Sequence, residues 1–235
     1  DGHAVQVGGV IVDSGKFDWQ NGKFPALTEP DESYHGVIYT KQFGPAAYIA
    51  KVRCHLMRDL GAQAAPMNAF LLNLGLETLA LRMERHCSNA LAVAKYLEAD
   101  PNIAWVNYPG LESSPYYELA KKYMPHGSCG VVSFGIKGGR EAATRFMDSL
   151  EMASVVTHVA DLRTCVLHPA STTHRQLTDE QLKEAGVPAD LIRLSVGIEN
   201  LEDTAKTEKK FSKSITFAGS ITKRRGTREE RFGTI

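Results

Sequence analysis

The amino-acid sequence predicts an α/β fold, and two observations support this prediction. Between residues 103 and 198, short β-rich apolar segments alternate with segments whose apolar residues recur at helical spacing. Such alternation is typical of a sheet with helices packed on it. A long stretch of helix-forming residues from Pro66 to Asp100 precedes this region. The chain has 235 residues, of which 43% are hydrophobic, so it can fill one large domain or two small ones.

The first sixty residues predict one strand, one loop and one helix. Residues 4–12 are a β-rich apolar run broken by two glycines, which indicates a strand. Residues 13–36 carry glycines and prolines among aromatic residues, which indicates a long ordered loop. From Pro45 to Leu60 the apolar residues recur at helical spacing, and Gly61 ends the pattern.

The remaining elements follow in chain order. Residues 66–100 predict one long helix, or two helices joined near Gly75. Four further strands and two further helices are expected: strands at 103–108, 130–136, 155–167 and 191–198, and helices after Pro115 and around 142–150. Thr178 and Gln181 have the spacing of a capping box, which predicts the start of another helix.

The last predicted strand carries an arginine on its polar face. Because side chains alternate along a strand, Ile192 and Leu194 share one face and Arg193 lies on the other, among small neighbours. One interpretation is a solvent-facing arginine. The other is a clamp for a carboxylate, since a planar guanidinium matches a carboxylate with two parallel hydrogen bonds. The strand pattern alone leaves both interpretations open.

Composition argues against several classes of function. Lys+Arg and Asp+Glu each number 27, so the formal net charge is zero and favours neither nucleic acid nor an anionic membrane as partner. The four cysteines form no CxxC pair and no zinc-type spacing with histidine, so we expect no disulfide framework and no metal site. There is no apolar run near the ~20 residues of a membrane span and no signal-peptide pattern. We therefore expect a soluble, cytoplasmic protein with a small-molecule partner.

After Glu202 the composition changes. Residues 203–235 are rich in Lys, Arg, Thr and Ser and include a basic cluster at 223–225. This composition predicts a solvated tail, with a contact to nucleic acid or to another partner as the alternative.

Five ordered segments resemble the Cys/Met-metabolism family of pyridoxal-phosphate (PLP) enzymes. They are Gly2-His3 with residues 7–12, residues 65–83, residues 106–111, residues 168–174 and residues 191–199. The resemblance covers residues 1–202 and implies fold type I of the PLP-dependent transferases, which is aspartate aminotransferase-like. It also implies that residues 1–75 are the end of the large PLP-binding domain and residues 76–202 the small C-terminal α/β domain, with 203–235 as an atypical basic tail.

Within this family, residues 17–36 resemble the insertion that the O-acetylhomoserine sulfhydrylases carry. The resemblance implies γ-replacement on O-acetyl-L-homoserine by sulfide, which gives L-homocysteine and acetate. Methionine γ-lyase and the cystathionine γ-synthases and γ-lyases are the alternative enzymes, and a non-catalytic fragment is the alternative of another class. PLP as cofactor of the full-length protein, and a homotetramer built as a dimer of dimers, are further implications.

The resemblance assigns three residues of this chain to substrate binding and none to catalysis. Arg193 matches the family arginine that binds the substrate α-carboxylate. His158 falls where many relatives carry Ser or Asn near that carboxylate, with an ordinary loop histidine as the alternative. Thr173 lies on a segment that borders the substrate in relatives, or else caps a turn. The Schiff-base lysine is expected three positions before Asp1, so the chain alone is expected to be inactive, and cofactor-binding residues stay unassigned.

Overall fold

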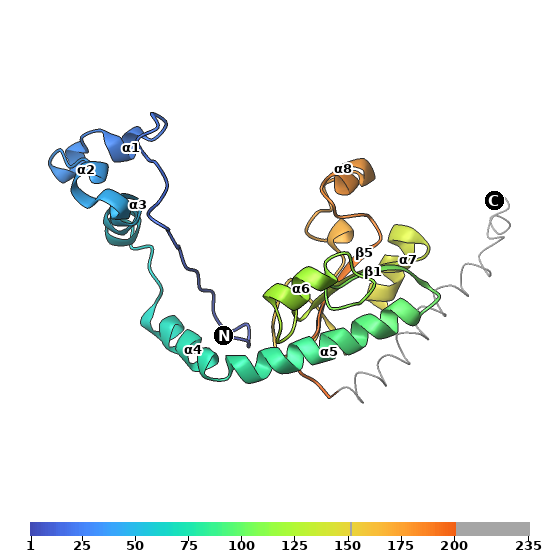
Figure 1. Ribbon diagram of the computed structural model, residues 1–235. Helices are drawn as coiled ribbons and strands as arrows, with labels where there is room; N and C mark the ends of the chain where they lie inside the picture. The colour runs from blue at the N-terminus through green and yellow to red at the C-terminus, as the bar shows by residue number, and fades with distance from the viewer. Residues whose placement is uncertain (151, 201–235) are drawn as a thin grey trace, which may run out of the picture. The chain divides into compact units, whose positions relative to one another are not determined.

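The computed structural model describes residues 1–150 and 152–200 and divides the chain into two compact units (Figure 1). One unit is Val5–Leu74, and the other joins Asp1–Ala4 to the residues from Gly75 onward. Each unit is folded around its own set of buried apolar residues. Within the described residues, no helix combines the length and apolarity that a membrane crossing needs. The predicted basic tail, residues 203–235, lies outside the described residues.

Short helices form the unit Val5–Leu74. They are α1 Pro25–Thr28, the 3-10 helix η1 Glu32–Tyr34, α2 Tyr39–Phe43, the 3-10 helix η2 Gly44–Ala46, α3 Ala47–Lys51 and the π-helix η3 Val52–Asp59. Leu27, Tyr39 and Ala47 form the buried centre of this unit. The helix predicted from Pro45 to Leu60 is confirmed, although its second half has π-helical hydrogen bonding.

The strand predicted at residues 4–12 is wrong. Val7, Val10 and Val12 are 87%, 85% and 84% exposed, and none of the described strands includes this segment. A β-rich composition favours a pleated, half-buried surface rather than a strand as such. Strand formation also requires a neighbouring strand that pairs with the backbone, and the described sheet belongs entirely to the other unit.

Aromatic side chains order the predicted loop of residues 13–36. The ring centroids of Phe17 and Trp19 lie 4.5 Å apart, and Phe24 meets both rings edge-on. Trp19 also stacks on Tyr48 of α3, with centroids 5.1 Å apart. Aromatic pairs contribute about 0.5–1.5 kcal/mol each beyond their burial. The prediction of an ordered loop is therefore confirmed, with α1 and η1 inside it.

Asp31 connects this loop to the helices that follow. One of its carboxylate oxygens lies 2.5 Å from Nζ of Lys51 and 2.9 Å from Nε2 of His55. The other oxygen accepts hydrogen bonds from the backbone and hydroxyl of Ser33. The hydrogen bond from Lys51 is the largest cause that holds the pKa of Asp31 below its usual range. Asp31 is therefore ionised at neutral pH and ties the loop to α3 and η3.

Two helices, not one, occupy residues 66–99. α4 spans Pro66–Glu77 and α5 spans Leu79–Ala99, and they meet at Thr78, three residues beyond the predicted junction. Gly75 lies within α4 and does not form the expected junction between the two helices. A Cβ atom at Gly75 would lie 2.6 Å from the backbone oxygen of Asp1, so only glycine allows this close approach.

The second unit contains a five-stranded sheet in the order β1-β2-β5-β4-β3. The strands are β1 Ile103–Asn107, β2 Val131–Ile136, β3 Ser154–Val155, β4 Cys165–Leu167 and β5 Leu191–Ser195. The remaining helices are α6 Tyr117–Tyr123, α7 Gly139–Asp148, the 3-10 helix η4 Pro169–Ser171 and α8 Asp179–Glu184. The predicted alternation of strands and helices is confirmed, and so is the capping box, in which Thr178 and Gln181 bond reciprocally at the start of α8.

The core of this unit lies between the sheet and helices α5 and α7 (Figure 1). Ile192 and Leu194 of β5 are buried there, and Phe134 of β2 meets Phe146 of α7 edge-to-face with centroids 6.0 Å apart. Arg193, between the two buried β5 residues, is only half-buried. The alternation predicted for the last strand is therefore confirmed over residues 191–194. Since the helices occupy the core face, the face that carries Arg193 is the one where a site can form.

Candidate functional site

The chain between β3 and β4 forms a loop over the face of the sheet that carries Arg193. This corrects the expectation of one strand region across 155–167, because residues 156–164 lie outside the two strands. β3 and β4 are parallel, so the connecting chain must run back along the strands before it re-enters the sheet. We call residues 156–164 the site loop. Its contacts with β5 define the candidate functional site.

Arg193 lies at the centre of the sheet and holds the site loop. Its neighbours in register are Ser133 on β2 and Leu167 on β4. Nη2 of Arg193 donates a hydrogen bond to the carbonyl oxygen of Thr157 at 2.8 Å. This bond uses one of the five N–H donors of the guanidinium and fixes the plane of the fork. A carboxylate can therefore bind to an already oriented guanidinium.

A second hydrogen bond attaches the site loop two residues further along β5. The hydroxyl of Ser195 accepts from the backbone N–H of Ala160 at 3.0 Å. Ala160 has φ +57°, in the left-handed region that alanine adopts only at a cost. Arg193 and Ser195, which share the polar face of β5, thus hold the two sides of the turn that contains His158. Ser195, one of the small neighbours expected on the face of Arg193, is buried and holds the loop.

The end of the site loop is fixed by backbone contacts that require a glycine. Glu199 accepts from the backbone N–H of Thr164 at 2.6 Å and from its hydroxyl at 3.0 Å, and the Thr164 hydroxyl accepts from Gly197 N–H at 3.0 Å. A Cβ atom on Gly197 would lie 2.4 Å from the carbonyl oxygen of Leu162. A side chain at Gly197 would therefore displace the loop from β5.

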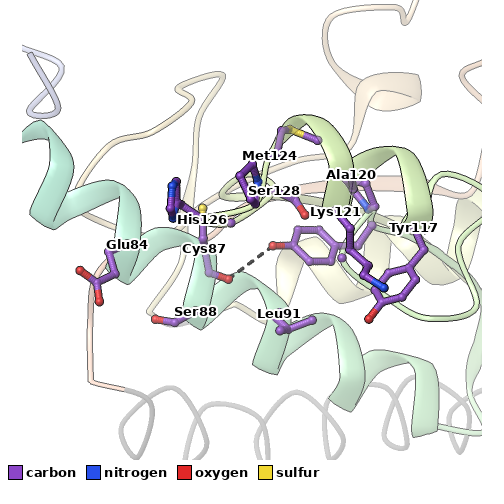
Figure 2. A pocket seen from close by; sticks show the side chains of 15 residues that line it. Glu84, Cys87, Ser88, Leu91, Tyr117, Ala120, Lys121, Met124, His126 and Ser128 are labelled. Carbon is purple, nitrogen blue, oxygen red and sulfur yellow. Dashed lines mark hydrogen bonds between the residues drawn. The ribbon is translucent and has the colours of Figure 1, made fainter.

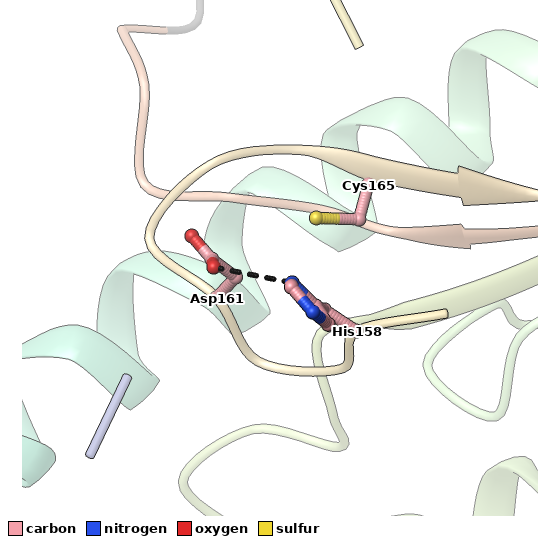
Figure 3. Close-up of side chains that lie close together, drawn as sticks. All are labelled: His158, Asp161 and Cys165. Carbon is pink, nitrogen blue, oxygen red and sulfur yellow. Dashed lines mark ion pairs between the residues drawn. The ribbon is translucent and has the colours of Figure 1, made fainter. Parts of the chain in front are cut away.

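His158 and Asp161 face each other within the site loop (Figure 3). Nδ1 of His158 lies 3.7 Å from Oδ2 of Asp161, and the histidine side chain is 44% exposed whereas the aspartate side chain is 1% exposed. Arg163 binds both oxygens of Asp161, each at 3.1 Å. This hydrogen bonding is the main reason why the pKa of Asp161 is lowered and that of Arg163 is raised. The site therefore contains an ionised carboxylate at neutral pH, beside an accessible imidazole.

The structure joins two of the three predicted site residues. Arg193 and His158 are linked through the carbonyl of Thr157, which immediately precedes the histidine. Thr173 lies beyond η4, is exposed, and has its hydroxyl 2.9 Å from Nδ1 of its neighbour His174. None of the hydrogen bonds found for Thr173 in the described part of the chain reaches Arg193 or His158. The geometry therefore groups Arg193 with His158 but not with Thr173.

Sequence reasoning missed three residues of the site: Asp161, Arg163 and Cys165. Cys165 begins β4, is buried, and donates its thiol to the carbonyl of Arg163 at 3.3 Å. Burial raises the pKa of this thiol, so it is protonated at neutral pH. The Asp-Leu-Arg order of residues 161–163 is the one local signal, because an aspartate and an arginine two residues apart in a turn can pair. His158 and Asp161 come close to Cys165 because the site loop returns to the sheet at that residue.

A separate pocket of about 520 Å³ lies between α5, α6 and the segment that follows α6 (Figure 2). Tyr108 lines it and donates to the carbonyl oxygens of Cys129, at 2.9 Å, and Cys87, at 3.4 Å. Burial raises the pKa of the Cys87 thiol, so this thiol is neutral and a poor nucleophile near pH 7. Neither Arg193 nor His158 lines this pocket. We therefore centre the candidate site on Arg193.

Comparison with known proteins identifies one family along most of the chain. Residues 1–207 match the profile of the family described as Cys/Met metabolism PLP-dependent enzyme. Homocysteine synthase of Schizosaccharomyces pombe is 52% identical over 204 residues, which are 86% of this chain and 48% of that protein. O-acetyl-L-homoserine sulfhydrylase 1 of Thermus thermophilus is 47% identical over 202 residues, again 86% and 48% of the two chains.

A solved structure gives the same result. The crystal structure of an O-acetylhomoserine (thiol)-lyase from Campylobacter jejuni, containing N'-pyridoxyl-lysine-5'-monophosphate, is similar to this chain with a TM-score of 0.72. The two sequences are 42% identical, and the match covers 80% of this chain and 45% of that one. The chain thus spans about half the length of the relatives that it matches.

Proposed function

The chain belongs to the Cys/Met metabolism family of PLP-dependent enzymes, and on this premise we propose that the whole protein is an O-acetyl-L-homoserine sulfhydrylase. The reaction replaces the acetate group of O-acetyl-L-homoserine with sulfide and yields L-homocysteine. Relatives named homocysteine synthase and O-acetyl-L-homoserine sulfhydrylase, at 47–52% identity, support this choice within the family. The observation in the structure that carries the proposal is the Arg193 guanidinium, held at the centre of the sheet beside the site loop.

Arg193 is proposed to bind the substrate α-carboxylate. An oriented guanidinium fork can accept this carboxylate with two parallel hydrogen bonds, and the bond to Thr157 restricts the fork before substrate arrives. Fixing the carboxylate also fixes the rotation of the substrate about Cα, and with it the bond that is positioned to break. The proposed role of Arg193 is therefore to select the bond as well as to bind the substrate.

His158 is proposed as a second donor to the same carboxylate. Its imidazole is accessible and lies one residue from the carbonyl that Arg193 holds. Nδ1 faces Asp161 at 3.7 Å, and Nε2, in the tautomer that carries the ring proton there, can donate to the carboxylate. Thr173 is proposed to border the bound substrate from the segment after η4, as in the family. Its exposed hydroxyl suits a contact with substrate, although its hydrogen bond is with His174.

PLP is the cofactor of this family, and the described residues fit the substrate side of its chemistry. When bound, PLP supplies an electron sink that makes bonds at the substrate Cα and Cβ labile. Arg193 offers a cation and His158 a hydrogen-bond donor for an amino-acid carboxylate, and the ionised Asp161 faces the other nitrogen of the histidine ring. We assign no residue of this chain as a ligand of the cofactor itself.

The wider organisation of the protein follows from the same premise. We propose fold type I of the PLP-dependent transferases, with residues 1–75 as the end of the large domain and residues 76–202 as the small C-terminal domain. A cytoplasmic homotetramer with the small molecules O-acetylhomoserine and sulfide as substrates completes the proposal. Family membership supports each of these points.

An assay of the complete protein tests the proposed function. Homocysteine formation from O-acetyl-L-homoserine and sulfide is compared with α-ketobutyrate release from methionine and from cystathionine. We expect the sulfhydrylase reaction to have the highest kcat/KM. A higher kcat/KM with methionine would instead identify a methionine γ-lyase, and a higher value with cystathionine would identify a cystathionine γ-lyase. No turnover of any substrate would favour a non-catalytic role.

A further inference from the structure

Three side chains of different chemistry converge where the site loop returns to the sheet. A ring nitrogen of His158, a carboxylate oxygen of Asp161 and the sulfur of Cys165 all lie within 4.8 Å of one another. Figure 3 shows the three side chains facing a common space. Nitrogen, oxygen and sulfur donors of these residue types are the ones that bind zinc in proteins.

One pair of the donors has the spacing of a zinc site. Zinc bonds of ~2.0–2.3 Å in a tetrahedral arrangement separate the ligand atoms by roughly 3.3–3.8 Å. The distance from Nδ1 of His158 to Oδ2 of Asp161 is 3.7 Å, within this range. The other separations are at most 4.8 Å, so side-chain rotations of His158 and Cys165 of up to about 1 Å are the adjustment that closes the set.

The surroundings of Asp161 leave one oxygen position available. Oδ1 accepts hydrogen bonds from the backbone N–H and from Nε of Arg163, whereas Oδ2 accepts only from Nη2 of the same residue. A carboxylate oxygen has two lone pairs, so Oδ2 retains one, on the atom that faces His158. Hydrogen bonds of this kind from outside the ligand set orient a metal-binding carboxylate.

The charges around the cluster determine which ion it suits. Arg163 and Arg193 bring positive charge, and Asp161 and Glu199 bring negative charge. A hard cation such as Mg²⁺ would gain little from this balance and prefers a set of oxygen ligands. An ion that displaces the proton of Cys165 gains a thiolate ligand, which favours Zn²⁺ or Co²⁺.

We infer that His158, Asp161 and Cys165 form a zinc-binding site beside Arg193. The sequence predicted no metal site, because the spacing His-x2-Asp-x3-Cys matches no common zinc motif and only the fold of the site loop brings the donors together. Three protein ligands leave a fourth position of the ion for water. The exposed side of His158 provides the path by which the ion enters. The inference does not depend on the proposed reaction.

Zinc content of the complete protein tests the site. The purified protein is incubated with zinc chloride, dialysed and analysed for metal, and its zinc affinity is measured by titration calorimetry. We expect the wild type to retain about one more zinc ion per chain than the variant His158→Asn. The affinity for zinc should be at least about tenfold weaker in that variant. Magnesium chloride in the same titration should give no heat of binding at this site. Equal zinc content and affinity in the wild type and His158→Asn would overturn the inference.

A matched pair of cysteine variants identifies the sulfur ligand. The thiols of Cys165 and Cys129 each donate to the carbonyl two residues away at 3.3 Å, but only Cys165 lies in the cluster. With Co²⁺ in place of zinc, we expect a thiolate-to-cobalt charge-transfer band that Cys165→Ser removes and Cys129→Ser leaves intact. The exposed His158→Asn variant should weaken the same band, which covers the case in which Cys165→Ser fails to fold. A band that persists in both Cys165→Ser and His158→Asn contradicts the proposal.

Discussion

Substitution of Arg193 by lysine tests its two hydrogen-bonding roles together. Lysine keeps the positive charge but loses the planar fork and the geometry that holds Thr157. A hydrogen bond to a charged group contributes about 1.5–3 kcal/mol. We therefore expect Arg193→Lys to lower kcat/KM for O-acetyl-L-homoserine by roughly tenfold to a hundredfold, measured by homocysteine formation in the complete protein.

Arg140 provides the control for this substitution. Its Nη1 also donates to a backbone carbonyl at 2.8 Å, that of Ala170, and it also pairs with Asp179. Arg140→Lys should therefore cost some stability while kcat/KM stays close to that of the wild type. Equal losses of kcat/KM in the two variants would show that the effect of Arg193→Lys is structural.

Ala160 offers a test of strain in the site loop. It has φ +57°, where a residue with a Cβ atom is unfavourable by about 1–2 kcal/mol. Glycine removes this penalty but loses about 0.4–1 kcal/mol through the entropy of the unfolded chain. We expect Ala160→Gly to raise the free energy of unfolding by about 0.5–1 kcal/mol, measured by urea denaturation. The exposed Ala185, with φ −74°, is the control, and Ala185→Gly should lower stability instead. A loss of stability in both variants would refute the strain argument.

At the scale of elements, the spacing of apolar residues predicted which face of a helix or strand is buried. It did not predict which strands pair with one another. Helix α7 and strand β5 were predicted because the apolar residues of each recur at the period of that element, and these apolar residues are buried in the structure. The segment 4–12 has the same β-rich composition but no pairing partner, so its prediction as a strand failed. Helix α2, Tyr39–Phe43, was missed because five residues are too few for a helical period to show.

His168 links two elements and makes their packing sensitive to pH. It follows β4, is fully buried, and donates from Nε2 to the carbonyl of Ala189 at 2.9 Å, just before β5. Its Nδ1 lies 2.9 Å from the hydroxyl of Ser171, which can donate to it when the ring is neutral. Burial is the main cause that lowers the pKa of His168 below its usual value of 6.5. The folded state therefore contains the neutral ring.

We predict that the chain loses stability as the pH falls below about 6.5 because the unfolded state then takes up a proton that the folded state does not. The free energy of unfolding should fall by up to about 1.4 kcal/mol per pH unit until the lowered pKa is reached. Above pH 6.5 both states hold the neutral ring and this dependence disappears. Urea denaturation at a series of pH values measures the slope.

The variant His168→Asn isolates this contribution. It should be less stable at pH 7.5, by about 1–3 kcal/mol, because a buried carbonyl loses its donor. Between pH 6.5 and 5.5 its stability should change less than that of the wild type. His174→Asn, at a less buried position nearby, is expected to keep the wild-type slope. A wild-type slope in His168→Asn would contradict the assignment.

At the scale of the whole molecule, the candidate site was only partly predictable. The face of Arg193 follows from the alternation along β5, and the family resemblance supplied its role. The position of the site loop over that face depends on the parallel pairing of β3 with β4, between residues eleven apart, such as Ser154 and Cys165. No local pattern specifies such a pairing. His158 was therefore proposed without its partners, and Asp161 and Cys165 were not proposed at all.

The proposed zinc site and the proposed carboxylate-binding site share His158. This leads to a prediction about the complete protein. Zinc bound at Nδ1 of His158 requires the ring proton on Nε2, the nitrogen proposed to donate to the substrate carboxylate, so zinc and substrate should strengthen each other's binding. L-Homoserine is a suitable probe because it carries the α-carboxylate and lacks the acetate leaving group. One hydrogen bond gained to a charged group, about 1.5–3 kcal/mol, sets the upper limit of this effect at a roughly tenfold to hundredfold tighter affinity.

Titration calorimetry of L-homoserine, with and without saturating zinc, measures this coupling. The dissociation constant should fall with zinc in the wild type, and L-homoserine should strengthen zinc binding by the same factor, because linkage between two binding sites is reciprocal. In His158→Asn, zinc should have little effect on homoserine affinity. If zinc binds the wild type but leaves homoserine affinity unchanged, the metal site stands and His158 is not a carboxylate donor. If homoserine binds and zinc does not, the zinc inference fails while the role of Arg193 is unaffected.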